Sequence, residues 1–289
     1  MKDKAQIKPK GIPRPKRMTI CIGMLASDGI VIAADAQESD QYYKRSQQKI
    51  MTFIGGVPLG ENRNKPSMAC AFTGAGEGGY VDAFIAEAIK TMPSNPPPNR
   101  REFEDFLATR VLEFHQKHLF PLASSNNPPE MQILVGAYVH WGTGIFVSYG
   151  STLRHALPHA AIGAGAHFAM SLIDDLDAIV DVRRTELLAA YVVGITKERI
   201  EGCGKYTAIV SLHNPVMCDT PGQPSQMLPP PNLLTHVPFA KIRKWEESFV
   251  GRWAPRQSKL VRELVEEELA TETKSASEPA PLPKDQIQS

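Results

Sequence analysis

The sequence predicts an α+β fold in which two β-sheets lie between two layers of helices. The chain has 289 residues, enough for one large domain with a substantial core. Runs rich in β-branched residues come in two groups, and a pair of helical segments follows each group. Because strands and helices come in blocks and do not alternate one by one, the pattern favours an αββα stack over a parallel βα fold.

The first group of strands is expected over residues 19–25, 29–35, 48–54 and 68–73. Isoleucine or valine recurs in both of the first two runs, and the Asp28-Gly29 step between them is typical of a tight hairpin. Two helices follow, over residues 80–92 and 101–119. The segment Pro93-Ser-Asn-Pro-Pro-Pro98 separates them because proline removes a backbone donor and interrupts a helix.

The second group begins with strands over residues 131–139 and 143–149, on either side of a turn at His140-Trp-Gly142. A second pair of helices is expected over residues 166–176 and 185–201, and a last strand over residues 206–212. Pro158 argues against a helix between the second strand pair and these helices.

The segments outside residues 18–214 differ from the domain in composition. Residues 1–17 carry seven basic side chains and no apolar stretch, which indicates a disordered tail or a propeptide. Eleven of the 24 prolines follow residue 214, which predicts a Pro-rich linker over residues 215–240. A helical extension is expected over residues 241–270 and a disordered tail over residues 271–289.

Overall composition excludes several classes of protein. The formal net charge is +1, so no bulk charge points to nucleic acid or to an anionic membrane as a partner. No run reaches the roughly 18 apolar residues that would cross a bilayer. The four cysteines are scattered and include no C-x-x-C pair. His155 and His159 are four residues apart, but Pro158 argues against a helix that would put both on one face, so polar or core roles are expected for these two and for His167. We therefore expect a cytoplasmic protein with reduced thiols and without a metal or an organic cofactor.

Thr19, Asp35 and Lys49 are the candidate chemical groups. A threonine hydroxyl is a poor nucleophile until a base takes its proton, and the α-amino group of an N-terminal threonine, with a pKa of about 8, can do so. A lysine held by an aspartate adds positive potential, which favours the alkoxide. Taken alone, each residue has a plainer interpretation, as an edge-strand threonine, a turn carboxylate or a surface lysine; only the three together are specific.

Several motifs resemble the proteasome β-type N-terminal-nucleophile (Ntn) hydrolase family. The opening of the chain carries them, as Thr19-Ile-Cys-Ile-Gly, Asp28-Gly-Ile-Val-Ile-Ala-Ala-Asp35, Gln37-Glu-Ser39, Gln48-Lys-Ile50 and Ala71-Phe-Thr-Gly74. Gln37 stands where proteasomes usually carry arginine, and in this it resembles the peptidase of the bacterial two-component ATP-dependent protease. Ile162-Gly-Ala-Gly-Ala-His-Phe-Ala169 and Gly202-Cys-Gly204 extend the resemblance to about residues 19–212. It implies the four-layer αββα Ntn-hydrolase sandwich, with a Pro-rich, partly disordered C-terminal extension outside it.

The resemblance also implies roles for individual residues. Thr19 is the expected nucleophile, Asp35 and Lys49 are its electrostatic partners, and the Gly74 N–H is the oxyanion donor. Ser39, together with Gln37, is expected to bind the substrate along a strand. The family further implies a polypeptide or small amide substrate, no cofactor and a homo-oligomer that forms a ring, and it leaves an ATPase partner open.

Three departures from the family keep alternatives open. Ala164 stands where the family has a serine, and the family's second aspartate has no counterpart, although Glu198 and Glu201 lie near its place. Met18 precedes Thr19, so translation starts at Met18, or residues 1–17 are a propeptide, or the threonine stays capped. The main prediction is a threonine-type peptidase or amidohydrolase. The alternatives are an inactive structural subunit and a small-molecule amidase.

Overall fold

The computed structural model describes residues 19–35, 37–39, 44–46, 49–55, 68–93, 96–125, 128–174, 180–201, 203–204, 206–214, 216–218, 226–228 and 233–251. The tails expected over residues 1–17 and 271–289 lie outside the described residues. The chain forms two compact units, Met1–Glu246 and Glu247–Ser289. Residues 239–246 of the first unit are helical and are called the C-terminal helix below; residues 247–251 of the second unit are helical too.

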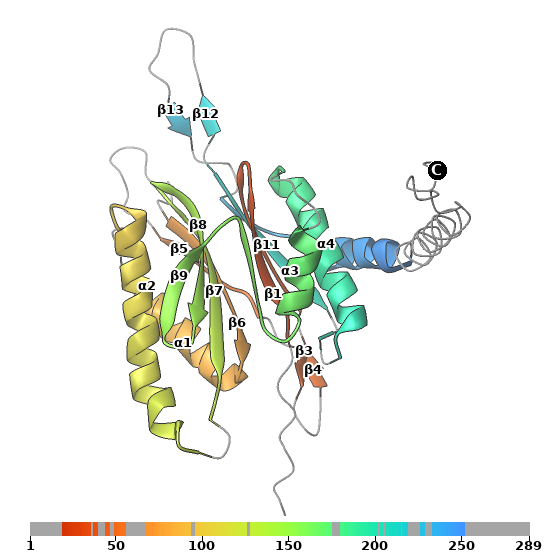
Figure 1. Ribbon diagram of the computed structural model, residues 1–289. Coiled ribbons are helices and arrows are strands. Elements are labelled where there is room, and N and C mark those ends of the chain that lie inside the picture. Colours follow the sequence, from red (N-terminus) through yellow and green to blue (C-terminus); the bar gives the residue numbers. More distant parts are fainter. Residues whose placement is uncertain are drawn as a thin grey trace, which may run out of the picture. The chain divides into compact units, whose positions relative to one another are not determined.

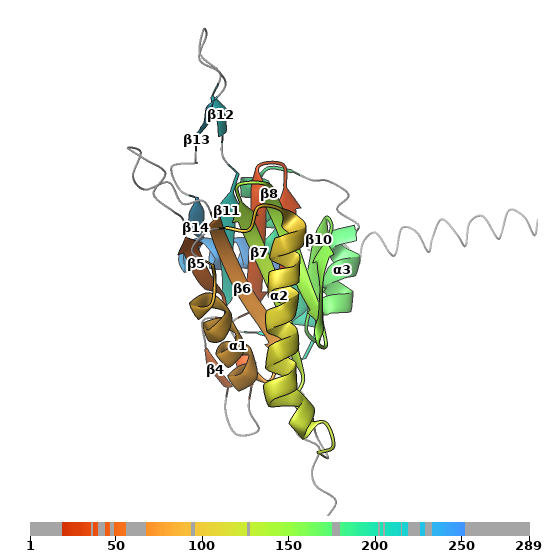
Figure 2. The ribbon, with the colours of Figure 1, turned by 90° about the vertical axis from the view of Figure 1, so that its left-hand side faces the viewer.

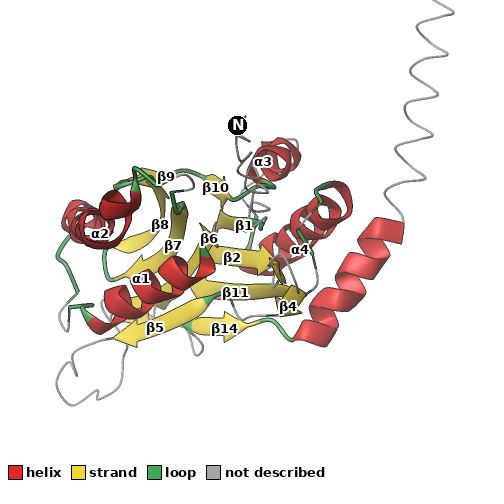
Figure 3. Cartoon of the chain, turned by 90° about the horizontal axis from the view of Figure 1, so that it is seen from below, coloured by secondary structure: helices red, strands yellow, loops and turns green. Residues whose placement is uncertain are grey.

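Two five-stranded antiparallel sheets form the centre of the first unit (Figures 1 and 3). The first sheet has the order β10-β1-β2-β11-β14, with bounds His159–Ile162, Cys21–Ala26, Gly29–Asp35, Thr207–His213 and Leu234–His236. The second has the order β5-β6-β7-β8-β9, with bounds Met51–Gly55, Met68–Gly76, Met131–Val139, Gly142–Tyr149 and Thr152–Ala156. Two small hairpins pair β3 (Gln37–Ser39) with β4 (Lys44–Ser46) and β12 (Val216–Cys218) with β13 (Gln226–Leu228). The predicted α+β class is confirmed.

The helices cover the outer faces of the two sheets (Figures 1 and 2). On the second sheet lie α1 (Gly78–Lys90) and α2 (Arg100–Phe114), and α2 continues into a π-helical turn over His115–Leu119 and a 3₁₀ turn over Phe120–Leu122. On the first sheet lie α3 (Ala166–Asp174) and α4 (Val182–Arg199). Capping residues stabilise the N-termini of two helices, because the side chains of Asn99 and Asp181 accept hydrogen bonds from backbone N–H groups of α2 and α4.

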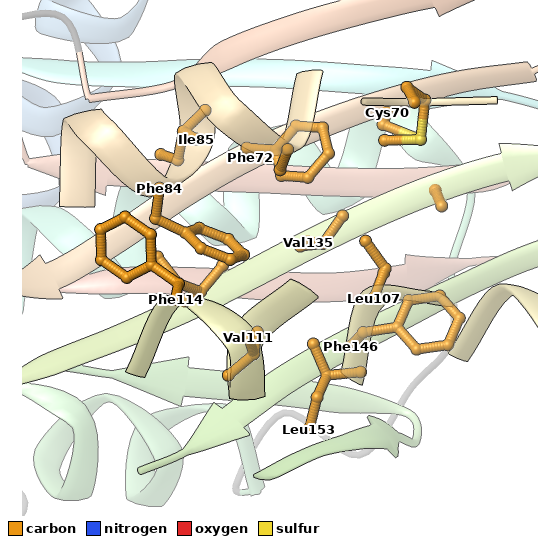
Figure 4. Packing of buried hydrophobic residues seen from close by; sticks show 14 of the residues in the cluster. Cys70, Phe72, Phe84, Ile85, Leu107, Val111, Phe114, Val135, Phe146 and Leu153 are labelled. Carbon is orange, nitrogen blue, oxygen red and sulfur yellow. The ribbon is translucent and has the colours of Figure 1, made fainter. Parts of the chain in front are cut away.

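Three apolar layers hold these four structural layers together. One cluster, which includes Phe72, Phe84, Phe114 and Phe146, fills the space between α1, α2 and the second sheet (Figure 4). A second cluster lies between the sheets and contains Ile30, Ile32, Leu134 and Ile145. A third, with Ile20, Ile22, Val31 and Val193, lies between the first sheet and α3 and α4. Successive residues of a strand alternate between clusters, as the pleat requires, so both central sheets are buried on both faces.

The structure differs from the sequence expectations at several edges. Strands β9 and β10 were not expected; a turn containing Pro158 separates these two short edge strands. The linker expected over residues 215–240 also contributes a strand, since β14 pairs with β11 and Leu233 is buried. Hydrogen bonding to the free edge of β11 explains why a three-residue segment after a proline run becomes ordered. No helix among the described residues is long and apolar enough to cross a membrane.

Candidate active site

The hairpin of β1 and β2 brings Thr19 to Asp35. The two strands pair from Cys21 with Ala34 to Ala26 with Gly29, and Ser27 and Asp28 form the turn. The same register continues beyond Cys21, where the Asp35 N–H donates to the Ile20 carbonyl at 3.0 Å. Because the turn is short and the pairing has no bulge, residues sixteen apart in sequence become neighbours.

The Thr19 hydroxyl lies between a carboxylate and an ammonium group. It donates to Oδ1 of Asp35, and Nζ of Lys49 donates to it. The same Nζ lies 3.1 Å from Asp35 Oδ1, so the three side chains form a closed triangle. Exposure is 4% for Thr19, 0% for Asp35 and 14% for Lys49, which leaves the lysine as the member nearest to solvent.

Backbone amides complete the surroundings of the buried Asp35 carboxylate. The Ile20 N–H donates to Oδ1 at 3.2 Å, and the Gly204 N–H donates to Oδ2 at 2.9 Å. A buried charge is tolerated where its oxygens are paired and hydrogen-bonded, and here both oxygens have partners. Gly204 is 169 residues from Asp35 and lies just before β11, so the tertiary fold is needed to complete the site.

A glycine turn between β10 and α3 lies against the Thr19 backbone. Gly163 has φ +93°, and a Cβ there would come within 2.3 Å of the Thr19 carbonyl oxygen. The Gly165 N–H donates to the same oxygen at 3.4 Å, and the Gln132 side chain accepts from the Gly163 N–H at 2.9 Å. Ala164, at the family's serine position, sits inside this turn.

Gly74 lies close to this site through Cys21. It belongs to β6, and continuing the β5–β6 register from Met51 and Phe72 puts Lys49 opposite Gly74. The Cys21 thiol donates to the Gly74 carbonyl at 3.4 Å, two residues along the chain from Thr19. Gly74 has no room for a side chain, since a Cβ would come within 2.5 Å of Val81.

The buried cysteines are unsuited to act as nucleophiles. Burial raises the pKa of the Cys21 thiol to about 11, although the nearby Lys49 ammonium partly opposes this. Burial likewise raises the pKa of Cys203 to about 12. Both thiols therefore stay protonated at neutral pH.

The remaining residues that the sequence suggested for the site are Gln37, Ser39, Glu198 and Glu201. Gln37 and Ser39 form β3, which is described as backbone only, so their substrate-binding roles stay predictions. Glu198 and Glu201, which lie in sequence near the place of the family's second aspartate, are exposed. The sequence did not predict that Gly163 contacts the Thr19 backbone or that the Gly204 N–H binds Asp35. The only sign of these contacts in the sequence is that both positions are glycines within short glycine-containing turns.

The described residues contain no group of three or more His, Cys, Asp or Glu side chains placed to hold a metal ion. A surface cavity of about 740 Å³ lies at the start of α2 and does not include the Thr19 site; it is lined by Asn99, Arg100, Arg101, Glu104, Asp105, Trp141 and Thr143.

Solved structures of Anbu proteins have a similar fold. The helical assembly of the Anbu complex from Pseudomonas aeruginosa matches at 16% identity and TM-score 0.60, over 84% of this chain and 96% of that one. A Gly-1 mutant of Anbu from Hyphomicrobium sp. strain MC1 matches at 13% identity and TM-score 0.59, over 83% of this chain and 96% of that one. Anbu (ancestral beta-subunit) from Yersinia bercovieri matches at 16% identity and TM-score 0.57, over 82% of this chain and 97% of that one. No protein-family model matches the chain, and no curated protein matches it.

These comparisons correct the family expected from the sequence motifs. The similar structures are Anbu proteins, a proteasome-like but distinct family, so the placement in the proteasome β-type family, next to the bacterial two-component peptidase, is wrong. At 13–16% identity the likeness shows the fold alone. The motifs that suggested the family belong to the hairpin and turns that build the Thr19 site, and such geometry identifies a fold better than it identifies a family.

Proposed function

We propose that the protein is a threonine-type amidohydrolase that cleaves peptide or other amide bonds through Thr19. The observation that carries this proposal is the Thr19 hydroxyl held between the Asp35 carboxylate and the Lys49 ammonium. A nucleophile positioned by hydrogen bonds, beside a cation that favours its anionic form, is the arrangement that covalent acyl transfer needs.

The reaction follows from this geometry in two steps. Thr19 Oγ1 attacks the amide carbon, its proton leaves to a base, and the carbonyl oxygen takes up the electron pair. Lys49 stabilises the alkoxide as it forms, and the Gly74 N–H is our candidate donor to the oxyanion. Collapse of this intermediate expels the amine, which takes the proton from the base and leaves an ester on Thr19. Water then hydrolyses that ester by the reverse proton transfers.

The base that fits this scheme is a free α-amino group on Thr19. While Thr19 is joined to Met18, its nitrogen is an amide whose lone pair is delocalised, and it cannot take a proton at neutral pH. We expect a form that starts at Thr19, made by cleaving a fusion directly before it, to hydrolyse amide reporters. Intact mass and N-terminal sequencing identify the form, and reporter turnover measures its activity.

The full chain is the matched control for this experiment. Unprocessed protein that starts at Met1 should be at least about 10²-fold slower, because general-base catalysis contributes about 10²–10⁴-fold. Equal turnover by both forms would show that another group is the base. Absence of turnover by the Thr19 form, across peptide and small amide reporters, would reject the proposed function.

Substitution of Lys49 tests the electrostatic part of the proposal. Lys49→Met should slow hydrolysis about 10²–10³-fold, the cost typical of losing one preorganised group that stabilises developing negative charge. Lys49→Arg should also be impaired, since a planar guanidinium does not fit where a compact ammonium contacts two oxygens. Single-turnover rates of both variants measure the effect; a near-native rate for Lys49→Met would return the lysine to a structural role.

A second candidate is an inactive structural subunit. The Met18–Thr19 peptide bond favours it, because a chain that keeps this bond lacks the amine base. The Anbu complex of P. aeruginosa forms a helical assembly, which supports the expectation that this chain forms a homo-oligomer, active or not. Light scattering of the purified chain measures that state.

A further inference from the structure

The C-terminal helix (residues 239–246) contacts the part of the chain that holds the second oxygen of Asp35. Gly204 donates to Asp35 Oδ2 at 2.9 Å and lies in the short connection between α4 and β11. This connection ends at Thr207, which is 2% exposed and lies directly opposite Asp35 in the β2–β11 register. The position of the Gly204 amide therefore depends on how firmly the start of β11 is fixed.

A buried polar triangle fixes the start of β11. The Thr207 hydroxyl donates to Oε1 of Glu246 and accepts from Nζ of Lys197 at 2.8 Å. Lys197 also pairs with Glu246 at 2.7 Å, and the two side chains are only 10% and 13% exposed. An ion pair this well shielded is weakened little by salt, and loss of the Glu246 carboxylate removes the acceptor that Lys197 and Thr207 share.

Two further contacts show that the surface is shaped for the C-terminal helix. Gly194 of α4 leaves room for the Glu246 side chain, since a Cβ there would come within 3.3 Å of Glu246 Cγ. Phe239, at the start of the helix, packs edge-on against Tyr206 with ring centroids 4.4 Å apart. Ile242, between these contacts, is 1% exposed. The helix thus touches the two residues, Tyr206 and Thr207, that follow Gly204 most closely among the described ones.

We infer that Glu246 is a positioning residue for the Thr19 site, acting through Thr207 and the Gly204 amide on Asp35; for catalysis, this inference rests on the proposed function. The C-terminal helix then contributes to the site indirectly, through the start of β11. Loss of the Glu246 charge should release the start of β11 and loosen the Gly204 contact with Asp35. A small displacement of this kind costs rate more than binding, because it moves the groups that align the nucleophile.

The test compares Glu246→Gln, Thr207→Val and Thr207→Ser in the full chain and in the form that starts at Thr19. Glu246→Gln keeps the shape and removes the charge; Thr207→Val removes the bridging hydroxyl, and Thr207→Ser restores it. Hydrogen–deuterium exchange of peptides covering residues 203–207 should be at least about tenfold faster in the first two variants and near wild type in Thr207→Ser. In the Thr19 form, kcat should fall about 10–100-fold with KM changed less than about twofold.

Glu186→Gln is the matched control. Glu186 accepts from the Ser211 hydroxyl at 2.8 Å and joins the same two elements, α4 and β11, farther along the strand. This variant should melt at a lower temperature but keep native exchange over residues 203–207 and native kcat. Circular dichroism checks that every variant folds.

Unchanged exchange over residues 203–207 in Glu246→Gln and Thr207→Val would overturn the inference, as would faster exchange with a native kcat. The exchange measurement needs no turnover. If the wild-type Thr19 form hydrolyses nothing, the proposed function fails, and exchange alone still decides whether Glu246 positions the Gly204 amide.

Discussion

Thr19→Ala should abolish hydrolysis and leave the fold intact. Removal of a nucleophile that works with its partners as a unit costs at least about 10⁴-fold in rate, because no other group can form the acyl intermediate. The fold should tolerate the change, since Lys49 and Asp35 keep their own contact at 3.1 Å. The lost hydroxyl hydrogen bonds should lower the free energy of unfolding by only about 1–2 kcal/mol. Reporter turnover and thermal melting measure the two effects.

Two variants separate this loss from a general effect of removing a buried hydroxyl. Thr185→Ala removes a buried hydroxyl that donates to the Asp181 carbonyl at the start of α4 and should keep native activity. Thr19→Ser keeps the attacking oxygen and should keep part of the activity. Labelling by an electrophile that traps N-terminal threonine should follow the same order. Turnover by Thr19→Ala at the wild-type rate would reject the mechanism.

Gly163→Ala should lower both the stability and the activity of the protein. At φ +93° an alanine is strained by about 1–3 kcal/mol, and its Cβ would also meet the Thr19 carbonyl oxygen at 2.3 Å. Because that oxygen belongs to backbone and cannot move aside, the turn or Thr19 itself must shift. We expect a loss of at least about 10²-fold in rate, as for a nucleophile misplaced by about 1 Å. Denaturant unfolding and reporter turnover measure the outcome.

Gly142→Ala is the control that separates backbone strain from the steric clash with Thr19. Gly142 also has a positive φ, +131°, but a Cβ there would meet nothing within 4 Å. The Gly142→Ala protein should lose stability because of backbone strain and should keep native activity. If Gly163→Ala were no more harmful than Gly142→Ala, the close approach to Thr19 would have no functional consequence.

The sequence allowed prediction of those parts of the site that depend on local geometry. A tight Asp28-Gly29 turn and two uninterrupted strands are enough to bring Thr19 to Asp35, and both are visible in the residues. The contacts of Gly163 and Gly204 depend on where β10 and β11 dock, which no short-range pattern records. Strand β14 escaped prediction because its three residues gain their order from the edge of β11 and not from their own propensity.

The position of β11 in the first sheet has a consequence for biosynthesis. β11 pairs with β2, although more than 170 residues separate Gly29 from His213 at the end of that register, while β1 and β2 form a local hairpin. Pairings of such high contact order form late, after the entropy of closing a long loop has been overcome. Thr19, Asp35 and Lys49 therefore emerge early from the ribosome, yet the Gly204 amide reaches Asp35 only after nearly the whole first unit has been synthesised. A nascent chain thus carries an incomplete site, and the order of synthesis itself delays the onset of any activity.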